Sequence, residues 1–374
     1  MKEPIRILHW GIRGHMGGIA TFLFSLYKSI DKSKVQFDFL IGHNEDIVFE
    51  DEIKAMGGNL YRVTYSKRES IVKSYKVLDD FFEKHKEFSG IHMHSCFINY
   101  SLPLRLAKKH NIPIRIFHSH NSQDMYPNRS IIKKIYMELE RKSILSSATG
   151  LMACSNEAGA YMFKNREFKW IKNGIDVDKF KYSQEVRDKK RNELHISSDC
   201  IVMGFTGRLQ YQKNPILLVE IFNEFQKKVE NSKLVIVGDG EIRNEVEAKI
   251  KSLNIEEKVV ILGNRNDANE MYQAMDIFVL PSRFEGFGIV LLEAQASGLK
   301  CFTTMNVPKE VEVTDNVYRN NTENPEEWAS QIYNNYLVST RNIDLKQFNE
   351  YDTRNVAKTV ADYYINELKG IQNG

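Results

Sequence analysis

The chain has 374 residues, of which 42% are hydrophobic and 27% are charged, and its formal net charge is +3. This composition is typical of a globular protein with about two domains, and it excludes the disordered, fibrous and collagen-like classes. The small positive charge is too weak to indicate a nucleic-acid-binding protein, although it is compatible with an anionic substrate or an anionic membrane surface.

The sequence does not indicate secretion or membrane insertion. Its clean apolar stretches, such as Ile216–Val219, are far shorter than the roughly 18 residues of a membrane span. Residues 1–4 run directly into a strand-like segment, so no secretory signal is expected. The four cysteines are widely separated, at Cys96, Cys154, Cys200 and Cys301. Without a Cys-x-x-Cys pair they predict neither a disulfide framework nor a zinc knuckle, and the expected location is the cytoplasm.

The first half of the chain alternates strand-like apolar runs with helical patterns, which is typical of α/β proteins with parallel sheets. The helical patterns include Ile19–Ile30 and Ser70–Lys84, and the Asn-Gly pair within Lys172–Asp176 indicates a turn. The predicted strands are Ile5–Trp10, Gln36–Ile41, Asn59–Val63, Gly90–His94, Ile114–His118, Thr149–Cys154 and Lys169–Ile171.

The same alternation begins again after a charged stretch at Gln184–Glu193. The predicted helices here include Pro215–Val229, Glu241–Leu253 and Ile289–Ser297, and a last helical pattern covers Asn355–Leu368. The predicted strands are Cys200–Phe205, Lys233–Val237, Lys258–Leu262, Ile277–Leu280 and Leu299–Thr303.

These patterns predict an α/β chain of two facing Rossmann-like domains with an interdomain cleft. The first domain is expected at residues 1–178 and the second at 179–354, with the helix at 355–374 packing back on the first. Ligands of open parallel sheets bind beyond the carboxyl ends of the strands. Motifs that directly follow strands are therefore the best candidates for a site.

The first such motif is the glycine-rich segment Gly11–Gly18, which lies between the first strand and a helix. Glycines let backbone N–H groups approach an anion, and the helix N-terminus adds a favourable dipole. The spacing GxxGxxGG matches neither the dinucleotide fingerprint nor the Walker A loop. A glycine-rich turn without a ligand therefore stays open as an alternative.

The second motif follows the strand that opens the second domain and contains two cations, Arg208 and Lys213. Together they could hold a diphosphate without any metal. Pro215 fits the first turn of the next helix, whose dipole would also attract an anion. The alternative is a solvated basic loop.

The third motif, Arg283–Glu293, is the most specific of the three. Glu285 falls in a loop after the strand Ile277–Leu280, and Glu293 falls about one turn into the following helix. Two carboxylates eight positions apart, with glycines beside the first, could bracket a ligand that has hydroxyl groups at one end and phosphate at the other.

Two further features carry weaker expectations. Pairs of histidines end two strands: His92 and His94, then His118 and His120. No cysteine, carboxylate or helical His-x3-His spacing completes a zinc site, so no metal is expected, and His120, or less strongly His118, is expected in the cleft. The segment Ser130–Ser143 carries basic residues among apolar ones and is either a surface for anionic lipid or a helix with a solvated face. Its basic residues are Lys133, Lys134, Arg141 and Lys142.

Taken together, these motifs resemble the retaining glycosyltransferases of family four, which have the GT-B fold. The resemblance covers essentially the whole chain, and its hallmark is Glu-x7-Glu from Glu285 to Glu293. It is strongest in Ile171–Asp176, Gly207–Pro215 and Met275–Cys301. Within the family, bacterial exopolysaccharide and capsule enzymes are the most similar, through Phe117–Ser122, Leu280–Gly286 and Glu293–Leu299.

The resemblance implies a role for each matching residue. Arg208 and Lys213 would hold the donor diphosphate and stabilise the leaving charge, Glu285 would contact hydroxyls of the donor sugar, and Glu293 would contact the ribose. His120 would be the cleft histidine. Backbone groups that would bind phosphate, sugar or base are those of Gly17, Gly18, Gly263, Asn264, Arg265, Phe287, Gly288 and Ile289.

The implied activity is transfer of a sugar, with retention, from a nucleotide diphosphate sugar to a saccharide or lipid-linked saccharide acceptor. A UDP-sugar donor is favoured, and no cofactor or metal is expected beyond this co-substrate. The alternatives are another GT-B enzyme, such as a sugar-nucleotide epimerase or an inverting transferase, and a non-catalytic nucleotide-sugar-binding scaffold. A nicotinamide dehydrogenase is disfavoured by the absent GxGxxG. The basic segment suggests peripheral contact with the inner membrane face.

Overall fold

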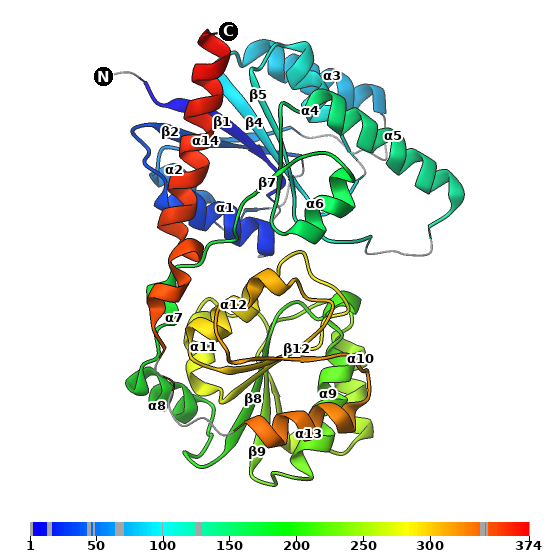
Figure 1. The fold of residues 1–374 in the computed structure, drawn as a ribbon, viewed down its shortest axis with the longest axis vertical. Helices are drawn as coiled ribbons and strands as arrows, with labels where there is room; N and C mark the ends of the chain where they lie inside the picture. Colours follow the sequence, from blue (N-terminus) through cyan, green and yellow to red (C-terminus); the bar gives the residue numbers. More distant parts are fainter. Residues whose placement is uncertain are drawn as a thin grey trace. The chain divides into compact units, whose positions relative to one another are not determined.

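The computed structural model describes residues 3–12, 17–42, 46–47, 49–63, 71–98, 100–124, 129–336, 341 and 343–373. The chain forms two compact units. The first unit contains Met1–Gly174 and Glu350–Gly374, and the second contains Ile175–Asn349. The last helix therefore belongs to the first unit (Figure 1).

The first unit is built on a seven-stranded parallel sheet with the order β3-β2-β1-β4-β5-β6-β7. Its strands are β1 (Ile5–Trp10), β2 (Val35–Ile41), β3 (Leu60–Arg62), β4 (Phe88–Ser95), β5 (Ile114–Ser119), β6 (Gly150–Ala153) and β7 (Lys169–Trp170). Its helices are α1 (Gly18–Ser29), α2 (Glu50–Ala55), α3 (Ile71–Lys84), α4 (Leu102–Lys109), α5 (Ile131–Ser147), α6 (Asn156–Phe163) and α14 (Thr353–Asn373).

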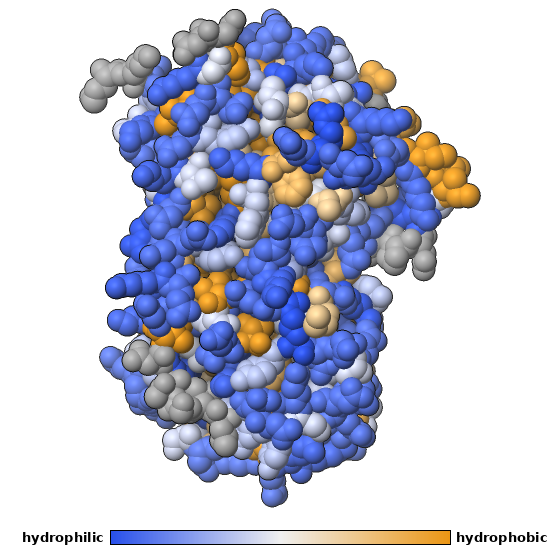
Figure 2. Space-filling model, viewed as in Figure 1, coloured by the Kyte–Doolittle hydropathy of each residue, from blue (hydrophilic) through white to orange (hydrophobic). Residues whose placement is uncertain are grey.

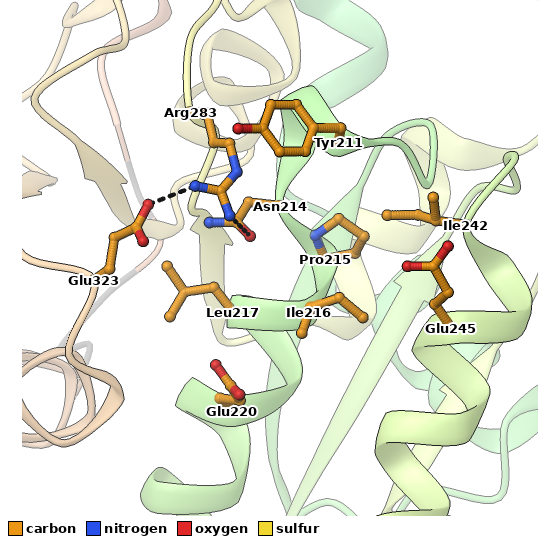
Figure 3. A pocket seen from close by; sticks show the side chains of 10 residues that line it. All are labelled: Tyr211, Asn214, Pro215, Ile216, Leu217, Glu220, Ile242, Glu245, Arg283 and Glu323. Carbon is orange, nitrogen blue, oxygen red and sulfur yellow. Dashed lines mark hydrogen bonds and ion pairs between the residues drawn. The ribbon is translucent and has the colours of Figure 1, made fainter.

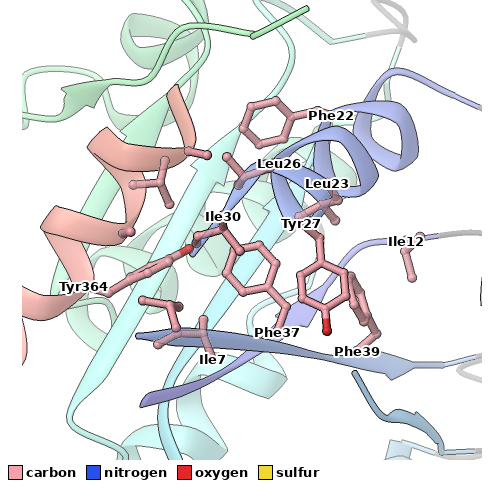
Figure 4. Packing of buried hydrophobic residues seen from close by; sticks show 14 of the residues in the cluster. Ile7, Ile12, Phe22, Leu23, Leu26, Tyr27, Ile30, Phe37, Phe39 and Tyr364 are labelled. Carbon is pink, nitrogen blue, oxygen red and sulfur yellow. The ribbon is translucent and has the colours of Figure 1, made fainter. Parts of the chain in front are cut away.

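Aromatic and branched side chains of β1, β2, α1 and α14 form the core on one face of this sheet (Figure 4). Every residue of β2 is buried, as expected for an interior strand of a parallel sheet that is covered on both faces. Its one charge, Asp38, accepts two hydrogen bonds from the guanidinium of Arg6, at 2.7 and 2.5 Å. From α14, Val360 and Tyr364 are fully buried in the same cluster.

Helix α5 exposes an unusual number of apolar side chains. Among the described residues, five of the eleven exposed large hydrophobic side chains lie on this helix: Ile131, Ile132, Ile135, Tyr136 and Leu139. Figure 2 shows the resulting apolar patch on the surface of the first unit. The side chain of Ser130 caps the helix by accepting a hydrogen bond from the amide of Lys133.

The second unit is built on a six-stranded parallel sheet with the order β10-β9-β8-β11-β12-β13. Its strands are β8 (Ile201–Thr206), β9 (Ser232–Val237), β10 (Val259–Ile261), β11 (Ile277–Leu280), β12 (Lys300–Thr304) and β13 (Val317–Asn320). Its helices are α7 (Val177–Phe180), α8 (Gln184–Glu193), α9 (Pro215–Gln226), α10 (Arg243–Ser252), α11 (Ala268–Ala274), α12 (Ile289–Ala296) and α13 (Pro325–Asn335).

The predicted fold class of two Rossmann-like domains is confirmed, with two differences in detail. The charged stretch Gln184–Glu193 forms helix α8, in which Lys190 and Arg191 are buried. Lys190 is paired there with Asp267 and Arg191 with Asp276, so charged rather than apolar side chains attach this helix. The structure also adds β13, an edge strand that the sequence analysis did not predict.

Candidate functional site

The strand order of the second unit places two motif loops side by side. Consecutive strands run outward from β8 to β10 on one side and from β11 to β13 on the other, so the order reverses between β8 and β11. In open parallel sheets this reversal leaves a crevice at the carboxyl ends of the strands, where ligands bind. The loop that contains Arg208 and Lys213 follows β8, and the loop that contains Glu285 follows β11.

Hydrogen bonds hold these two loops together. The amide of Arg283 donates to the carbonyl of Gln212 at 2.8 Å, and the side-chain amide of Gln212 donates to the carbonyl of Phe284 at 3.0 Å. The Arg283 guanidinium donates to Asn214 Oδ1 at 3.2 Å and lies over the ring of Tyr211 (Figure 3). The loop that carries the cations is thereby fixed against the loop that carries the carboxylate.

A buried ion pair joins Lys213 to Glu285. Lys213 Nζ lies 2.6 Å from Glu285 Oε1, and the hydroxyl of Ser282 donates to the same oxygen at 2.6 Å. Both charged side chains are largely buried, with 14% and 6% of their surfaces exposed. The two residues are 72 positions apart in the sequence, yet they form one preorganised pair of charges.

Removing Lys213 should therefore cost stability as well as activity. Lys213→Ala leaves Glu285 buried without its cation, and breaking one partner of a buried pair typically destabilises by about 3 to 5 kcal/mol. We expect urea denaturation of Lys213→Ala to show a loss of this size. The double variant Lys213→Ala with Glu285→Gln should recover part of the loss, whereas equal stability of Lys213→Ala and the wild type would contradict a buried pair.

Arg208 has a different environment from Lys213. Half of its side chain is exposed, at 51%, and its Nε lies 3.2 Å from Glu241 Oε2 at the surface. The site thus combines one fixed cation, on Lys213, with one cation on a long side chain that reaches into solvent. Its contact with Glu241 is a surface ion pair, of a kind that contributes little to stability.

The second carboxylate, Glu293, lies partly buried on α12. Its Oε2 accepts a hydrogen bond from the hydroxyl of Tyr272 at 2.7 Å. Burial raises the pKa of Glu293 to about 7, although the Tyr272 hydroxyl and the charge of Lys213 act in the opposite direction. Lys213 therefore acts electrostatically on both carboxylates of the Glu-x7-Glu motif.

Helix α12 begins immediately beside this carboxylate pair. Its N-cap is Gly288, with a φ of 89°, a left-handed conformation that favours glycine. A Cβ at Gly288 would lie 3.7 Å from Cγ of Glu285, so the helix start and the first carboxylate are neighbours. Phe287 is buried behind the turn. The first amides of a helix have no partner within it, so those of Ile289 and Val290 are candidates to bind an anion, whereas the amide of Leu291 donates to the carbonyl of Gly288.

Glycines at the ends of β8, β9 and β10 pack backbone against backbone. The amide of Gly207 donates to the carbonyl of Val237 at 2.9 Å, and the amide of Gly238 donates to the carbonyl of Gly263 at 2.8 Å. A Cβ at Gly238 would lie 2.0 Å from the carbonyl oxygen of Gly207, so only glycine fits there. Gly207 and Gly263 lie in motifs that the sequence indicates, whereas Gly238 was not predicted, although it directly follows a predicted strand.

In the first unit, the predicted histidines lie on one face of the sheet. His92 and His94 are on β4, His118 is on β5, and His120 follows β5. His118 is fully buried, whereas His120 is partly exposed and its Nε2 lies 3.0 Å from Nδ1 of His94. A fifth member, His9 of β1, was not predicted from the sequence. Its Nδ1 lies 3.1 Å from His94 Nε2.

The glycine-rich segment of the first unit is described only in part. Arg13–Met16 lie outside the described residues. Gly17 is the N-cap of α1, and a Cβ at Gly17 or Gly18 would meet no heavy atom within 4 Å. Both glycines are exposed, so the backbone at the start of α1 is accessible to a ligand.

Comparison with known proteins decides the family. A family model described as Glycosyltransferase Family 4 matches residues 16–179, and one described as Glycosyl transferases group 1 matches residues 186–339. The chain is 30% identical to EpsF of Bacillus subtilis (strain 168), a protein assigned as a glycosyltransferase, over 82% of this chain and 81% of EpsF. The chain is a family-four glycosyltransferase.

Other known proteins are similar to this glycosyltransferase in sequence or in fold. An Escherichia coli protein named UDP-Gal:α-D-GlcNAc-diphosphoundecaprenol α-1,3-galactosyltransferase is 25% identical over 81% of this chain and 80% of its own length. Anabaena Alr3699/HepE, solved in complex with UDP and glucose, superposes with a TM-score of 0.72 at 18% identity, covering 99% of this chain and 98% of HepE. The GT-B class predicted from the sequence is confirmed.

Some of the predicted residues of the glycosyltransferase form one cluster in the second unit, and others belong to other parts of the fold. Lys213, Glu285, Gly288 and Glu293 form one cluster in the second unit. In the predicted base-binding segment, Gly263 joins the glycine contact and Asn264 is exposed. Arg265 is engaged with Asp267 and Glu193, at 2.7 and 2.6 Å. Gly17, Gly18 and His120 belong to the first unit.

The raised pKa of Glu293 predicts a pH-dependent stability. Between its ordinary value of 4.5 and about 7, the folded glycosyltransferase holds a proton that the unfolded chain has released. Unfolding free energy should therefore fall as pH rises through this window, by up to about 1.4 kcal/mol per pH unit, and level off above it. Glu293→Gln removes this contribution. Urea denaturation from pH 5 to 8 should show the stability of the variant, relative to the wild type, increasing with pH; a constant difference would refute the assignment.

Proposed function

We propose that this glycosyltransferase moves a sugar, with retention of its anomeric configuration, from a UDP-sugar to a saccharide or lipid-linked saccharide acceptor in cell-surface polysaccharide synthesis. The observation that carries the proposal is the charged cluster at the strand ends of the second unit. Lys213 and Glu285 are fixed 2.6 Å apart, with Arg208 on the same loop as Lys213 and the start of α12 beside Glu285. The second unit would bind the donor, and the first unit the acceptor.

The cluster supplies the groups that a nucleotide diphosphate sugar needs. Two cations and the amides at the start of α12 offer charge and hydrogen bonds to a diphosphate. The two carboxylates accept hydrogen bonds, as sugar and ribose hydroxyls require. Glu285 would bind the donor sugar and Glu293 the ribose. Because Arg208 and Lys213 themselves provide positive charge, we propose that transfer proceeds without a metal ion.

The names of relatives support the choice of donor and acceptor. The Escherichia coli relative is named for a UDP-galactose donor and a diphosphoundecaprenol-linked acceptor. A Campylobacter jejuni relative, 40% identical over 24% of this chain, is named for transfer of N-acetylgalactosamine to a saccharide on diphosphoundecaprenol. A Staphylococcus aureus relative, 21% identical over 97% of this chain, is named for capsular polysaccharide biosynthesis. These names favour a UDP-sugar and a lipid-linked saccharide here.

The chemistry follows from the proposed binding. The bond between the anomeric carbon and the diphosphate oxygen breaks while the acceptor hydroxyl forms a new bond on the same face of the sugar. The acceptor proton passes to the departing phosphate oxygen, so UDP leaves with one additional proton. The protein contributes positioning and electrostatic stabilisation, chiefly from Arg208 and Lys213, as negative charge develops on the diphosphate.

We further propose that helix α5 holds the enzyme at a membrane surface where lipid-linked acceptors lie. In the described residues, no helix is both long and apolar enough to span a bilayer. Instead, α5 exposes Ile131, Ile132 and Ile135 beside the exposed residues Lys133 and Lys134. An apolar stripe flanked by cations is the arrangement that binds an anionic lipid surface. Arg141, by contrast, is engaged with Glu138 and with the carbonyl of Met162.

Sedimentation with vesicles tests the role of α5. We expect binding to vesicles that contain phosphatidylglycerol, weaker binding to pure phosphatidylcholine, and a several-fold loss when Ile132 and Ile135 become serine. Replacing Lys133 and Lys134 by glutamine should remove the preference for anionic lipid, at about 1 kcal/mol per charge. Met305→Ser, at an exposed apolar residue of the second unit, is the matched control. Equal binding by all variants would remove the support for this surface.

A transfer assay tests the proposed function as a whole. Purified protein is given UDP-sugars with EDTA present and a set of diphosphoundecaprenol-linked saccharides, and the product is analysed by proton NMR. We expect glycosyl transfer with the anomeric configuration of the donor retained. An inverted product would contradict the retaining mechanism. Sugar transfer that occurs only after divalent metal is added back would contradict the metal-independent mechanism.

A further inference from the structure

Five histidines form a grid on one face of the first unit's sheet, across the central strands β1, β4 and β5. The strand register pairs His9 with His92, and His94 with His118. His120 follows β5 and stacks against His118, with ring centroids 4.2 Å apart. The ring of Phe22 from α1 covers this end of the grid, at 5.5 Å from His120 and 6.0 Å from His94.

Three of these rings form a continuous hydrogen-bonded chain. His9 Nδ1 lies 3.1 Å from His94 Nε2, and His94 Nδ1 lies 3.0 Å from His120 Nε2. The other two rings are outside this chain: His92 bonds through Nδ1 to the hydroxyl of Tyr364 on α14, and neither ring nitrogen of His118 has a partner among the described residues. His94 is thus the central member, bonded through both of its nitrogens.

The hydrogen bonds that link His9, His94 and His120 have only one favourable donor-to-acceptor direction. A neutral imidazole carries one N–H, so His94 must donate to one neighbour and accept from the other. If His120 were the first donor, the last N–H would be on Nε2 of His9. That atom is buried without a partner among the described residues, and the ring of His9 packs on the ring of Phe37. A buried N–H without an acceptor is rarer and costlier than a bare acceptor nitrogen, so His9 is the first donor.

This direction fixes the tautomer of His120. His9 donates from Nδ1 to Nε2 of His94, and His94 donates from Nδ1 to Nε2 of His120. The proton of His120 is then on Nδ1. His120 is partly exposed, and its Nδ1 is not one of the buried nitrogens that lack a partner among the described residues. This edge of the ring therefore reaches the surface. Burial lowers the pKa of all three histidines, which keeps the chain neutral near pH 7.

We propose that His94 and His9 are positioning residues that hold His120 as the Nδ1–H tautomer, so that its exposed edge donates a hydrogen bond to an oxygen of the sugar substrate. The inference rests on the proposed function and on the family resemblance, which implies that His120 is the cleft histidine and so contacts substrate. It adds a direction to that contact: the substrate atom must be an acceptor, because bare Nε2 is turned inward to His94 and only Nδ1–H faces out.

Nitrogen-15 NMR of histidine-labelled enzyme tests the hydrogen bonds between the three histidines without reference to activity, because it distinguishes a protonated ring nitrogen from a bare one. In the wild type we expect His120 protonated at Nδ1. In His94→Phe we expect a mixture of both tautomers and a kcat about tenfold lower, as for one misdirected hydrogen bond. In His94→Gln, the side-chain amide can still donate to Nε2 of His120. This variant should therefore restore most of the Nδ1–H tautomer of His120 and most of the kcat.

His118→Phe is the matched control, since it alters an equally buried ring of the same grid that is outside the chain. It should leave the His120 tautomer unchanged. Protonation of wild-type His120 at Nε2, or an unchanged tautomer in His94→Phe, would overturn the inference, and the wild-type spectrum decides even if a variant does not fold. If the wild-type enzyme transfers no sugar but its His120 is protonated at Nδ1, the proposed function would be refuted. The inference about the hydrogen bonds between the three histidines would still stand.

Discussion

Arg208→Ala should lower kcat roughly 100- to 1000-fold while leaving the protein as stable as the wild type. Removing one group that stabilises transition-state charge typically has an effect of this size, because the group acts where charge develops. Stability should not change, because the Arg208 side chain is half exposed and its contact with Glu241 is a surface one. Initial rates with a UDP-sugar, together with urea denaturation, measure both quantities.

The comparison with Lys213 separates the two cations. Lys213→Ala should lose both activity and stability, because Lys213 neutralises the buried carboxylate of Glu285. Arg208→Ala should lose activity alone. Lys227→Ala is the matched control, since Lys227 is an exposed cation at the far end of α9 that pairs with Glu224. A correctly folded Arg208→Ala with a near-wild-type rate would contradict the role of Arg208 in leaving-group stabilisation.

Mild acid should unfold the first unit before the second. The pKa values of His9, His92, His94, His118 and His120 are all lowered, mainly by burial. Below about pH 6.5 the unfolded chain therefore binds protons that the folded unit excludes, and the unfolding free energy falls as pH falls. Each histidine lowers the unfolding free energy by up to about 1.4 kcal/mol per pH unit, so the five together lower it by up to about 7 kcal/mol per pH unit.

A loss of this size is decisive, because the whole stability of a domain is only about 5 to 15 kcal/mol. The second unit contains a single histidine, His195, and its partly buried Glu293 gains a proton over the same range, so the second unit should not weaken in parallel. Hydrogen exchange read by mass spectrometry at pH 7, 6 and 5 follows each unit separately. We expect peptides of β1, β4 and β5 to lose protection first. Simultaneous loss in both units, or full protection of the first at pH 4.5, would contradict the prediction.

Most strands were predictable because apolar side chains predominate in them. The bounds of β1 and β11 match the predicted Ile5–Trp10 and Ile277–Leu280. Helix α8 was not predictable from periodicity, since its buried positions are Lys190 and Arg191, whose burial depends on carboxylates that lie far along the chain. The edge strand β13 has only half-buried residues before Asn320, so it lacks the apolar run that marks the other strands.

The candidate site could be predicted as motifs but not as contacts. Glu285 and Lys213 each belong to a recognisable loop, yet only the adjacency of β8 and β11 brings them 2.6 Å apart. The packing of Gly238 on Gly207 depends in the same way on strand order. His9 is one histidine in an ordinary strand, and its hydrogen bond to His94 follows from a register that the sequence does not reveal.

We expect the charged cluster of the second unit to bind the diphosphate of a UDP-sugar without a metal. Calorimetric titration of UDP, GDP and ADP in EDTA tests it most directly. We predict saturable binding of UDP that weakens in Arg208→Ala and is unchanged in Lys227→Ala. A UDP concentration 100 times the Kd should raise the unfolding free energy by about 2.7 kcal/mol. Binding of none of the three nucleotides, or binding that appears only when metal is restored, would contradict the account.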